Sequence, residues 1–272
     1  MISVITPCLN ICKDGRLEYF EKMMESIHNQ TWTDLEHLVI DGGSTDGTIE
    51  ILKQYQIKGW INHLVSEKDS GLYSAMNKGI RASHGEYIHI MNTDDFFLDL
   101  DYFKRSMEVL EDGEYDFTHA DRVIKSRKGK PDKVKKGDER VAFFRMPFRH
   151  QTMIVSRDVF DEVGMFDETY QIAADYKFVL QMLLAGRKGS HFPETVLCSL
   201  DGGASSNREK CIQEVSQVIF ETYGHRNGLT HDDCGAIYRR MISPELNSKI
   251  LSNVREQRII DSLEICYQQS NP

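Results

Sequence analysis

No uninterrupted apolar run in the 272-residue chain approaches the ~20 residues that a membrane-spanning helix needs. The N-terminal segment 1–7 also lacks the basic region and the cleavage site of a secretory signal peptide. The six cysteines are scattered without metal-site spacing, and in a chain of this length they fit reduced thiols better than a disulfide framework. These absences predict a soluble, cytoplasmic protein, and they leave attachment to the inner surface of a membrane open.

An overall excess of positive charge is missing too. The net charge is −9, whereas nucleic-acid-binding proteins usually carry an excess of Lys and Arg, so we expect no nucleic-acid partner. Residues 122–140 are the exception, with nine Lys/Arg against three Asp/Glu, a local charge of +6 that leaves −15 for the remainder. This basic run fits a solvated loop, or a lid attracted to phosphates or to an anionic lipid surface.

The first 100 residues alternate short apolar runs with amphipathic helical patterns. This alternation is typical of an α/β fold whose mostly parallel, twisted, Rossmann-like sheet is flanked by helices. Pro7 is expected to end the first strand. The expected strands are 2–6, 36–40, 62–66 and 86–91, and the expected helices between them are 17–27, 49–55 and 73–82.

The pattern loosens beyond residue 100, and we see no internal repeat and no low-complexity linker. From about residue 208 the chain is predicted to form helices with polar connections. We therefore expect a main domain over 1–206, divided into halves 1–100 and 101–206, and a helical extension over 207–272. The later predictions are helices 103–110, 174–184, 211–223, 237–242 and 246–263, and strands 116–120, 152–156 and 191–199.

Polar segments follow each of the first four expected strands. Ligands of parallel sheets bind beyond the carboxyl ends of the strands, so these segments should converge on one crevice. That convergence is stronger evidence for a site than any single motif. The four segments are Thr6-Pro7, Asp41-Gly42-Gly43, Glu67-Lys68-Asp69 and Asp94-Asp95.

Asp94 and Asp95 directly follow the apolar run 87–91. Two adjacent carboxylates repel each other, which raises one pKa unless a cation offsets the charge. Mg²⁺-like ions take one or two protein carboxylates and complete their shell with water and phosphate oxygens. The pair therefore indicates a metal held between the protein and a diphosphate. The alternative is a turn or a helix cap.

Three further positions have a functional and a structural interpretation each. Asp41 can accept hydrogen bonds from a ligand, or it belongs to a glycine-rich turn before a helix. Asn77 and Lys78 lie about one turn into a helix, where they can reach a sugar hydroxyl and a phosphate, or they are ordinary solvated surface.

Asp175 lies near the start of an expected helix among mostly apolar neighbours. Partial burial would raise its pKa and make it a proton acceptor; the alternative is an N-cap. His150 and Gln151 precede strand 152–156 and can donate hydrogen bonds to a phosphate or an acceptor, although a lone histidine is usually structural.

Together these residues resemble the inverting family 2 glycosyltransferases of bacterial polysaccharide assembly, which have the GT-A fold. The resemblance runs from Ser3 to about Ser206. Asn92 departs from it, because it stands at the first acidic position of the Asp-x-Asp motif, and Ser74 stands where related sequences often carry Asp. The segment Gly202-Gly203-Ala204-Ser205 and the pair His150-Gln151 also match such enzymes.

The resemblance implies a role for each site residue. Asp95 would bind Mn²⁺ or Mg²⁺, Asp175 would be the catalytic base, and His150 and Gln151 would contact acceptor or phosphate. The half 1–100 would bind the nucleotide and the half 101–206 the acceptor. The implied donor-binding residues are Thr6, Pro7, Asn10, Asp41, Asp69, Asn77, Lys78, Asn92 and Asp94.

The implied reaction is a single displacement with inversion, from a UDP-, GDP- or dTDP-sugar to a saccharide acceptor. By the same resemblance, a lipid-linked diphosphate saccharide is a reasonable acceptor. One rival is a sugar-nucleotide nucleotidyltransferase, but the segment 6–11 after the first strand lacks the glycine-rich phosphate loop of such enzymes. Another is a non-catalytic sugar-nucleotide-binding subunit. The presence of Asp94, Asp95 and Asp175 argues against it.

Overall fold

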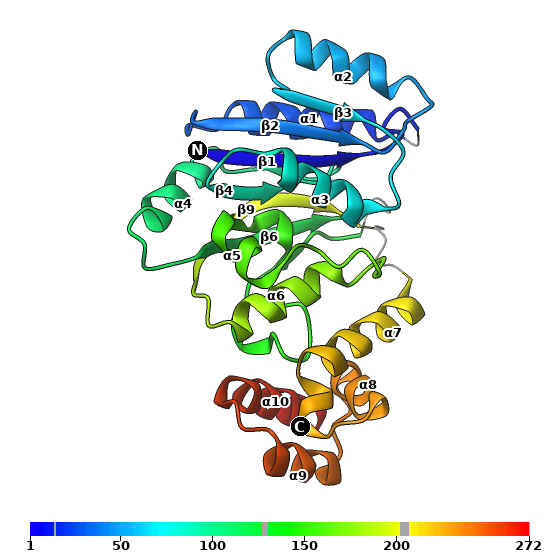
Figure 1. Cartoon of the computed structure of the whole chain (residues 1–272), viewed down its shortest axis with the longest axis vertical. Helices are drawn as coiled ribbons and strands as arrows, with labels where there is room; N and C mark the ends of the chain where they lie inside the picture. The colour runs from blue at the N-terminus through cyan, green and yellow to red at the C-terminus, as the bar shows by residue number, and fades with distance from the viewer. Residues whose placement is uncertain (14, 127–129, 202–206, 272) are drawn as a thin grey trace.

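A computed structural model describes residues 1–13, 15–126, 130–201 and 207–271. Within these residues a nine-stranded, curled sheet is flanked by helices, and the C-terminal helices gather at the far end of the molecule from β3 (Figure 1). None of the helices in this part of the chain has the length and apolar character that crossing a bilayer requires.

The N-terminal half of the sheet is parallel, in the order β3-β2-β1-β4. A helix connects each strand to the next, as predicted, because every connection between parallel strands must cross back over the sheet. The elements are β1 (Ile2–Cys8), α1 (Leu17–His28), β2 (Leu35–Asp41), α2 (Thr48–Ile57), β3 (His63–Ser66), α3 (Leu72–Ala82) and β4 (Tyr87–Ile90).

Pro7 lies inside β1, so the expectation that it ends the strand is wrong. The Ile5 carbonyl accepts a hydrogen bond from Met91, on the β4 side, and the Cys8 carbonyl accepts one from Gly42, on the β2 side. Residues of a parallel strand alternate between the two sides, so Pro7 faces the β4 side. The pairing with β4 stops at Ile5, and the missing N–H of Pro7 therefore costs no ladder hydrogen bond.

The second half of the sheet mixes parallel and antiparallel pairs. β8 (Ile154–Ser156) is antiparallel to β4 and to β6 (Phe117–Lys125), and β9 (Gly189–Leu200) is parallel to β6. The predicted α/β class with flanking helices is confirmed, while parallel pairing is continuous only in the N-terminal half. This half also contains β5 (Phe96–Phe97), α4 (Tyr102–Leu110), β7 (Lys133–Lys135), α5 (Arg157–Val163) and α6 (Ala174–Leu184).

Two described parts of the basic run 122–140 pair as strands, namely the end of β6 (122–125) and β7 (133–135), so these parts are not a solvated loop. β7 pairs with the end of β6, so that Arg122 lies opposite Lys135 and Ile124 opposite Lys133. Short 3₁₀ turns follow at Glu139–Val141 and at His150–Thr152. The hairpin brings part of the local positive charge to the second half of the sheet.

Two hydrophobic cores cover the two faces of the sheet. Val4 and Val39 pack with α1 in one core, whereas Ile5 and Ile40 pack with α3 in the other. Neighbouring residues of β1 and β2 thus enter opposite cores, which explains why these strands read as continuous apolar runs.

The C-terminal helices share the core of the main domain. Leu229, Ile237 and Leu263 belong to the same buried cluster as Val179 of α6. The single helix expected over 246–263 is wrong, because the backbone is extended at Val254 and two helices form. The helices are α7 (Arg208–Ile219), a π-helical turn (Phe220–Gly224), a 3₁₀ turn (His225–Asn227), α8 (His231–Arg239), α9 (Pro244–Asn253) and α10 (Gln257–Ser270).

The predicted boundary between 1–206 and 207–272 coincides with segment 202–206, which lies outside the described residues, as does the motif Gly202-Gly203-Ala204-Ser205. The division of the chain into these parts stays a prediction.

Candidate active site

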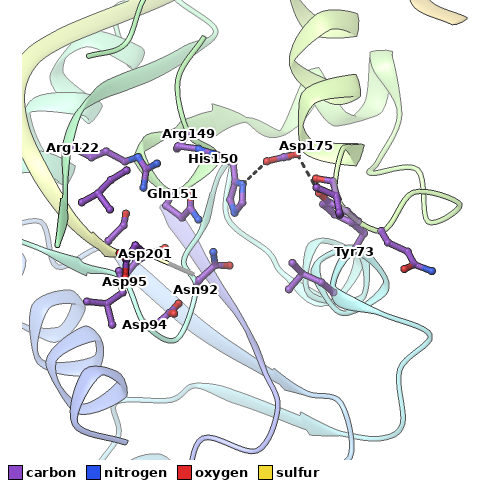
Figure 2. Close-up of a pocket in the computed structure, with 16 residues that line it drawn as sticks. Tyr73, Asn92, Asp94, Asp95, Arg122, Arg149, His150, Gln151, Asp175 and Asp201 are labelled. Atoms are coloured by element: carbon purple, nitrogen blue, oxygen red, sulfur yellow. Dashed lines mark hydrogen bonds and ion pairs between the residues drawn. The ribbon is translucent and has the colours of Figure 1, made fainter. Parts of the chain in front are cut away.

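A cavity of about 310 Å³ lies beyond the end of β4, between β6, β9 and the start of α6 (Figure 2). Its lining comes from segments that are far apart in the sequence: the turn after β4, the strand β6, the turn 149–151 and the first residues of α6. The cavity brings together six of the residues singled out from the sequence: Asn92, Asp94, Asp95, His150, Gln151 and Asp175.

Asp95 is buried in the turn that follows β4, where its N–H donates to the Asn92 carbonyl at 3.3 Å. Burial, together with the charge of Asp94, raises the pKa of Asp95 to about 7, and the Arg122 guanidinium partly offsets the rise. The electrostatic conflict expected from the sequence is therefore present, and it falls on Asp95. A cation at this carboxylate would favour its ionised form.

Two arginines line the cavity opposite this acidic pair. Figure 2 shows Arg122 and Arg149 above Asp94 and Asp95. Arg122 is buried, and burial, with repulsion from Arg149, lowers its pKa to about 10. These groups place positive charge beside the carboxylates, where a diphosphate would need it.

The sequence analysis missed both arginines as site residues. Arg149 immediately precedes the pair that was singled out, His150-Gln151. Arg122 could have been predicted as a site residue by extending the predicted strand 116–120 to residue 124. Side chains alternate along a strand with a period of two, so Ala120, Arg122 and Ile124 then share one face. That extension was hidden by the basic composition of the run.

Asp175 is the second residue of α6 and is held by three neighbours. Its Oδ1 accepts hydrogen bonds from the Tyr73 hydroxyl at 3.1 Å and from the Tyr176 N–H at 2.9 Å. Its Oδ2 lies 3.2 Å from His150 Nδ1. Burial and the Asp175 charge raise the pKa of Tyr73, so this hydroxyl stays protonated and donates.

The expected rise in the pKa of Asp175 is wrong. Burial does raise it, but the hydrogen bond and the charge of His150, the charge of Arg149 and the hydrogen bond from the Tyr176 N–H together outweigh burial, and the pKa lies below its ordinary value.

The N-cap interpretation is also not met. Ala173 is the N-cap residue of α6 and has no side-chain cap, and Asp175 lies inside the first turn. Glu214 of α7 instead fixes the segment before α6, since its Oε2 accepts from the N–H groups of Ile172 at 2.7 Å and Ala173 at 3.0 Å.

Several polar atoms at the cavity are buried without a partner among the described residues. They are Asn92 Oδ1, Arg122 Nε, His150 Nε2 and Gln151 Oε1. Buried polar atoms in folded proteins are nearly always hydrogen-bonded, so a concentration of unpaired ones around a cavity indicates a place for a polar ligand.

Other predicted donor residues lie along the carboxyl edge of the parallel strands but do not line the cavity. The Asp41 carboxylate accepts from the N–H groups of Gly43 at 3.1 Å and Ser44 at 3.0 Å, and from the Ser66 hydroxyl at 2.8 Å. Asn10 joins this loop to the end of β1, because its Oδ1 accepts from Thr45 N–H at 3.0 Å. Thr6 and Pro7 are buried within β1.

The residues around α3 are similarly occupied. Lys78 forms ion pairs with Asp69 and, at 2.8 Å, with Glu67, and these hydrogen bonds raise its pKa. Asn77 is buried and exchanges hydrogen bonds with the backbone of Phe166 at 2.8 and 3.1 Å. In contrast, Asp69 Oδ2 is buried without a partner in the described part of the chain.

Comparisons with known proteins agree with this architecture. The sequence model of Glycosyl transferase family 2 matches residues 3–166, so the match ends before Asp175. A PGL/p-HBAD biosynthesis glycosyltransferase of Mycobacterium bovis is 25% identical over 210 residues, which are 76% of this chain and 79% of the relative. Escherichia coli chondroitin synthase is 34% identical over 115 residues, 40% of this chain and 16% of the synthase.

Two solved structures show the same fold. Staphylococcus aureus TarS 1–349, in complex with UDP-GlcNAc, superposes with a TM-score of 0.65 at 17% identity, over 100% of this chain and 81% of TarS. The mannosyltransferase PcManGT of Pyrobaculum calidifontis, in complex with GDP-Man and Mn²⁺, superposes with a TM-score of 0.62 at 16% sequence identity. The superposition covers 99% of this chain and 86% of PcManGT. At these identities the likeness concerns the fold alone, and the expected GT-A fold is confirmed.

Proposed function

Because the chain belongs to glycosyltransferase family 2, we propose that it moves a sugar from a nucleoside diphosphate donor to an acceptor hydroxyl with inversion, in the assembly of a cell-surface polysaccharide or glycan. The observation that carries this proposal is the cavity in which Asp94-Asp95 and Asp175 line opposite parts of one space. The names of the relatives support a biosynthetic role, and the complexes of TarS and PcManGT support a nucleotide-sugar donor.

We place the donor along the carboxyl edge of β1, β2 and β3, with its diphosphate reaching the cavity. Asp41 and Asn10 shape the loops that would contact the nucleoside, and the unpaired Oδ2 of Asp69 offers an acceptor to a donor hydroxyl or N–H. Asn77 and Lys78 support this edge by fixing α3 and by pairing with Asp69. Asn92 and Asp94 lie where the donor sugar would enter the cavity.

The residues present fit a hard divalent cation. Asp95 and Asp94 supply carboxylate oxygens and Asn92 supplies an unpaired amide oxygen, which is a donor set typical of Mg²⁺ or Mn²⁺. The raised pKa of Asp95 indicates a carboxylate that lacks sufficient positive charge nearby. When bound, the ion would neutralise the diphosphate leaving group as a Lewis acid.

Asp175 is the proposed base. Its carboxylate takes the proton of the acceptor hydroxyl while that oxygen forms a bond to the anomeric carbon and the bond to the nucleoside diphosphate breaks. A lowered pKa keeps Asp175 ionised at neutral pH, and Tyr73 and His150 fix its orientation. The positive charges of Arg122 and Arg149 stabilise the negative charge that develops on the leaving diphosphate.

A second cavity of about 430 Å³ supports an anionic acceptor. It shares Arg122 and Arg149 with the first cavity and adds Lys135, Lys136 and Arg145, while Asp138 is the one acidic residue among the described residues that line it. A lipid-linked saccharide diphosphate suits this charge, and it would bring the protein to the cytoplasmic surface of a membrane. The acceptor would then be bound by the 101–206 half.

A thermal-shift panel of UDP-, GDP- and dTDP-sugars, with and without Mn²⁺, tests the donor assignment. Specific binding raises the melting temperature by mass action. We expect one nucleotide to stabilise the protein, more strongly with Mn²⁺ than without it. A non-catalytic subunit would show this binding without slow donor hydrolysis, and absence of stabilisation by every member of the panel contradicts the proposal.

A further inference from the structure

A cluster of metal-ligating side chains lies at the opposite end of the sheet from the cavity. Glu36 is near the start of β2, His63 is the first residue of β3, and His84 lies in the connection between α3 and β4. These are amino ends of parallel strands, whereas the cavity follows the carboxyl end of β4. The cluster is therefore separate from the proposed active site and does not depend on the proposed function.

The distances within the cluster match a tetrahedral metal site. Glu36 Oε2 lies 3.4 Å from His63 Nε2 and 3.3 Å from His84 Nδ1. Ligand atoms bound to Zn²⁺ at about 2.0–2.1 Å are separated by about 3.3–3.4 Å at the tetrahedral angle. The three donor atoms all lie within 4.8 Å of one another, so small rotations of the imidazoles bring both nitrogens to a common ion.

The Glu36 carboxylate is already held in place by its other oxygen. Oε1 accepts hydrogen bonds from the Ser3 hydroxyl at 2.6 Å, from the His84 N–H and from the Gly85 N–H at 3.2 Å. Burial raises the pKa of Glu36, but these donors outweigh burial and the pKa is lowered, so the carboxylate is charged. Such outer contacts are typical of metal ligands, because they fix orientation and leave one oxygen for the ion.

Exposure and ligand chemistry indicate which ion fits. The Glu36 side chain is 8% exposed, whereas the side chains of His63 and His84 are 48% and 68% exposed. The site therefore opens to solvent on the imidazole side and leaves a fourth position for water. Two imidazoles and one carboxylate favour Zn²⁺ over Mg²⁺, which prefers oxygen ligands.

We propose that Glu36, His63 and His84 bind one Zn²⁺ per chain and thereby tie β2, β3 and the α3–β4 connection together. This zinc site is distinct from the oxygen-rich position around Asp95. It stabilises the N-terminal half of the sheet, because an ion that binds only the folded chain raises the free energy of unfolding.

Isothermal titration of the metal-stripped 272-residue chain with Zn²⁺ tests the site. We expect one equivalent to bind, and we expect His63→Gln or His84→Gln to weaken that binding by about 10–100-fold or more. His225→Gln is the matched control, since His225 is an exposed histidine of the C-terminal region. Co²⁺ in place of Zn²⁺ should give the intense visible absorption of a tetrahedral nitrogen–oxygen site, and the two cluster variants should lose it.

Thermal unfolding separates metal binding from simple folding defects. Without metal, the cluster variants should melt close to the wild type. Zn²⁺ added over excess Mg²⁺, which occupies the oxygen-rich position around Asp95, should stabilise the wild type and the His225→Gln control more than the cluster variants. Failure of the wild type to bind Zn²⁺ overturns the proposal. So does equal binding by the cluster variants and the control, because the cluster would then be an ion pair between Glu36 and protonated histidines.

Discussion

The two halves of the sheet use their polar side chains differently. In the parallel half, Asp41 and Asn77 are hydrogen-bonded to the protein itself and hold loops and helices in place. In the turn that follows β4 and in the mixed half, atoms of Asn92, His150 and Gln151 are buried without partners in the described structure. The parallel half is mostly completed by its own chain, with Asp69 Oδ2 as an exception, whereas several atoms of the mixed half are left to be paired by a ligand.

Asp175→Asn tests the mixed half where the largest effect is expected. The amide keeps the shape and most hydrogen bonds but removes the proton acceptor, so transfer should fall by about 10²–10⁴-fold while donor binding is retained. Product formation and donor-induced thermal shifts measure the two quantities separately.

Asp161→Asn is the control for this change, because Asp161 is an exposed residue of α5 outside the cavity. It should leave transfer unchanged. Full turnover by the Asp175→Asn protein would remove Asp175 from the role of base.

Asp95→Asn examines how the cavity carboxylates affect stability. The folded-state pKa of Asp95 is raised from 3.8 to about 7, so the folded chain binds a proton more tightly than the unfolded chain. This contribution to stability is present below about pH 4 and is lost as the pH rises to about 7, at up to ~1.4 kcal/mol per pH unit.

The Asn variant should lack that loss. Denaturant unfolding of both proteins in the presence of a chelator, at several values between pH 4 and 7.5, compares the slopes. If the stabilities of the two proteins depend on pH in the same way, Asp95 does not have a raised pKa in the folded chain.

Paired leucine substitutions compare the two halves directly. Asn77→Leu removes three hydrogen bonds to the 166–168 segment and should lower the free energy of unfolding by about 1–3 kcal/mol or more. Gln151→Leu replaces a side chain whose Oε1 is unpaired, so its effect on stability should be small or favourable, while transfer is reduced. Equal destabilisation in urea unfolding would erase the distinction between the halves.

The same contrast explains how much the sequence predicted. The strands and helices up to residue 91 follow from local periodicity, and α6 was predicted at its observed bounds. In the mixed half the decisive contacts are non-local. The two-residue β5 and the three-residue β7 have too few residues to show a period, and the basic composition of the run 122–140 hid the end of β6, so the burial of Arg122 was missed.

The site residues divide in the same way. Asp94, Asp95 and Asp175 were found because carboxylates after a strand or among apolar residues conflict with their surroundings. The pKa of Asp175 was predicted in the wrong direction, because the partner that lowers it, His150, is 25 residues away in the sequence. Glu36, His63 and His84 escaped notice because no local motif joins residues from three separate segments.

The smallest effect is expected at the rim of the second cavity, where Arg145 is exposed. If the acceptor is anionic, Arg145→Gln should raise its KM by about 2–5-fold at low salt, the size of one solvent-exposed charge contact, and added salt should remove the difference. The measurement uses a panel of short-chain alkyl-diphosphate saccharides as acceptors, at fixed saturating donor.

Arg226→Gln is the matched control, because Arg226 is also exposed, is paired with Glu256 and lies outside this cavity. It should leave the KM unchanged, and neither variant should alter slow donor hydrolysis, which needs no acceptor. A change in KM that is equal for both variants, or one that persists at high salt, would assign the cationic lining to folding rather than to acceptor binding. The positive charges of the mixed half would then stabilise the fold, as most of the polar side chains of the parallel half do.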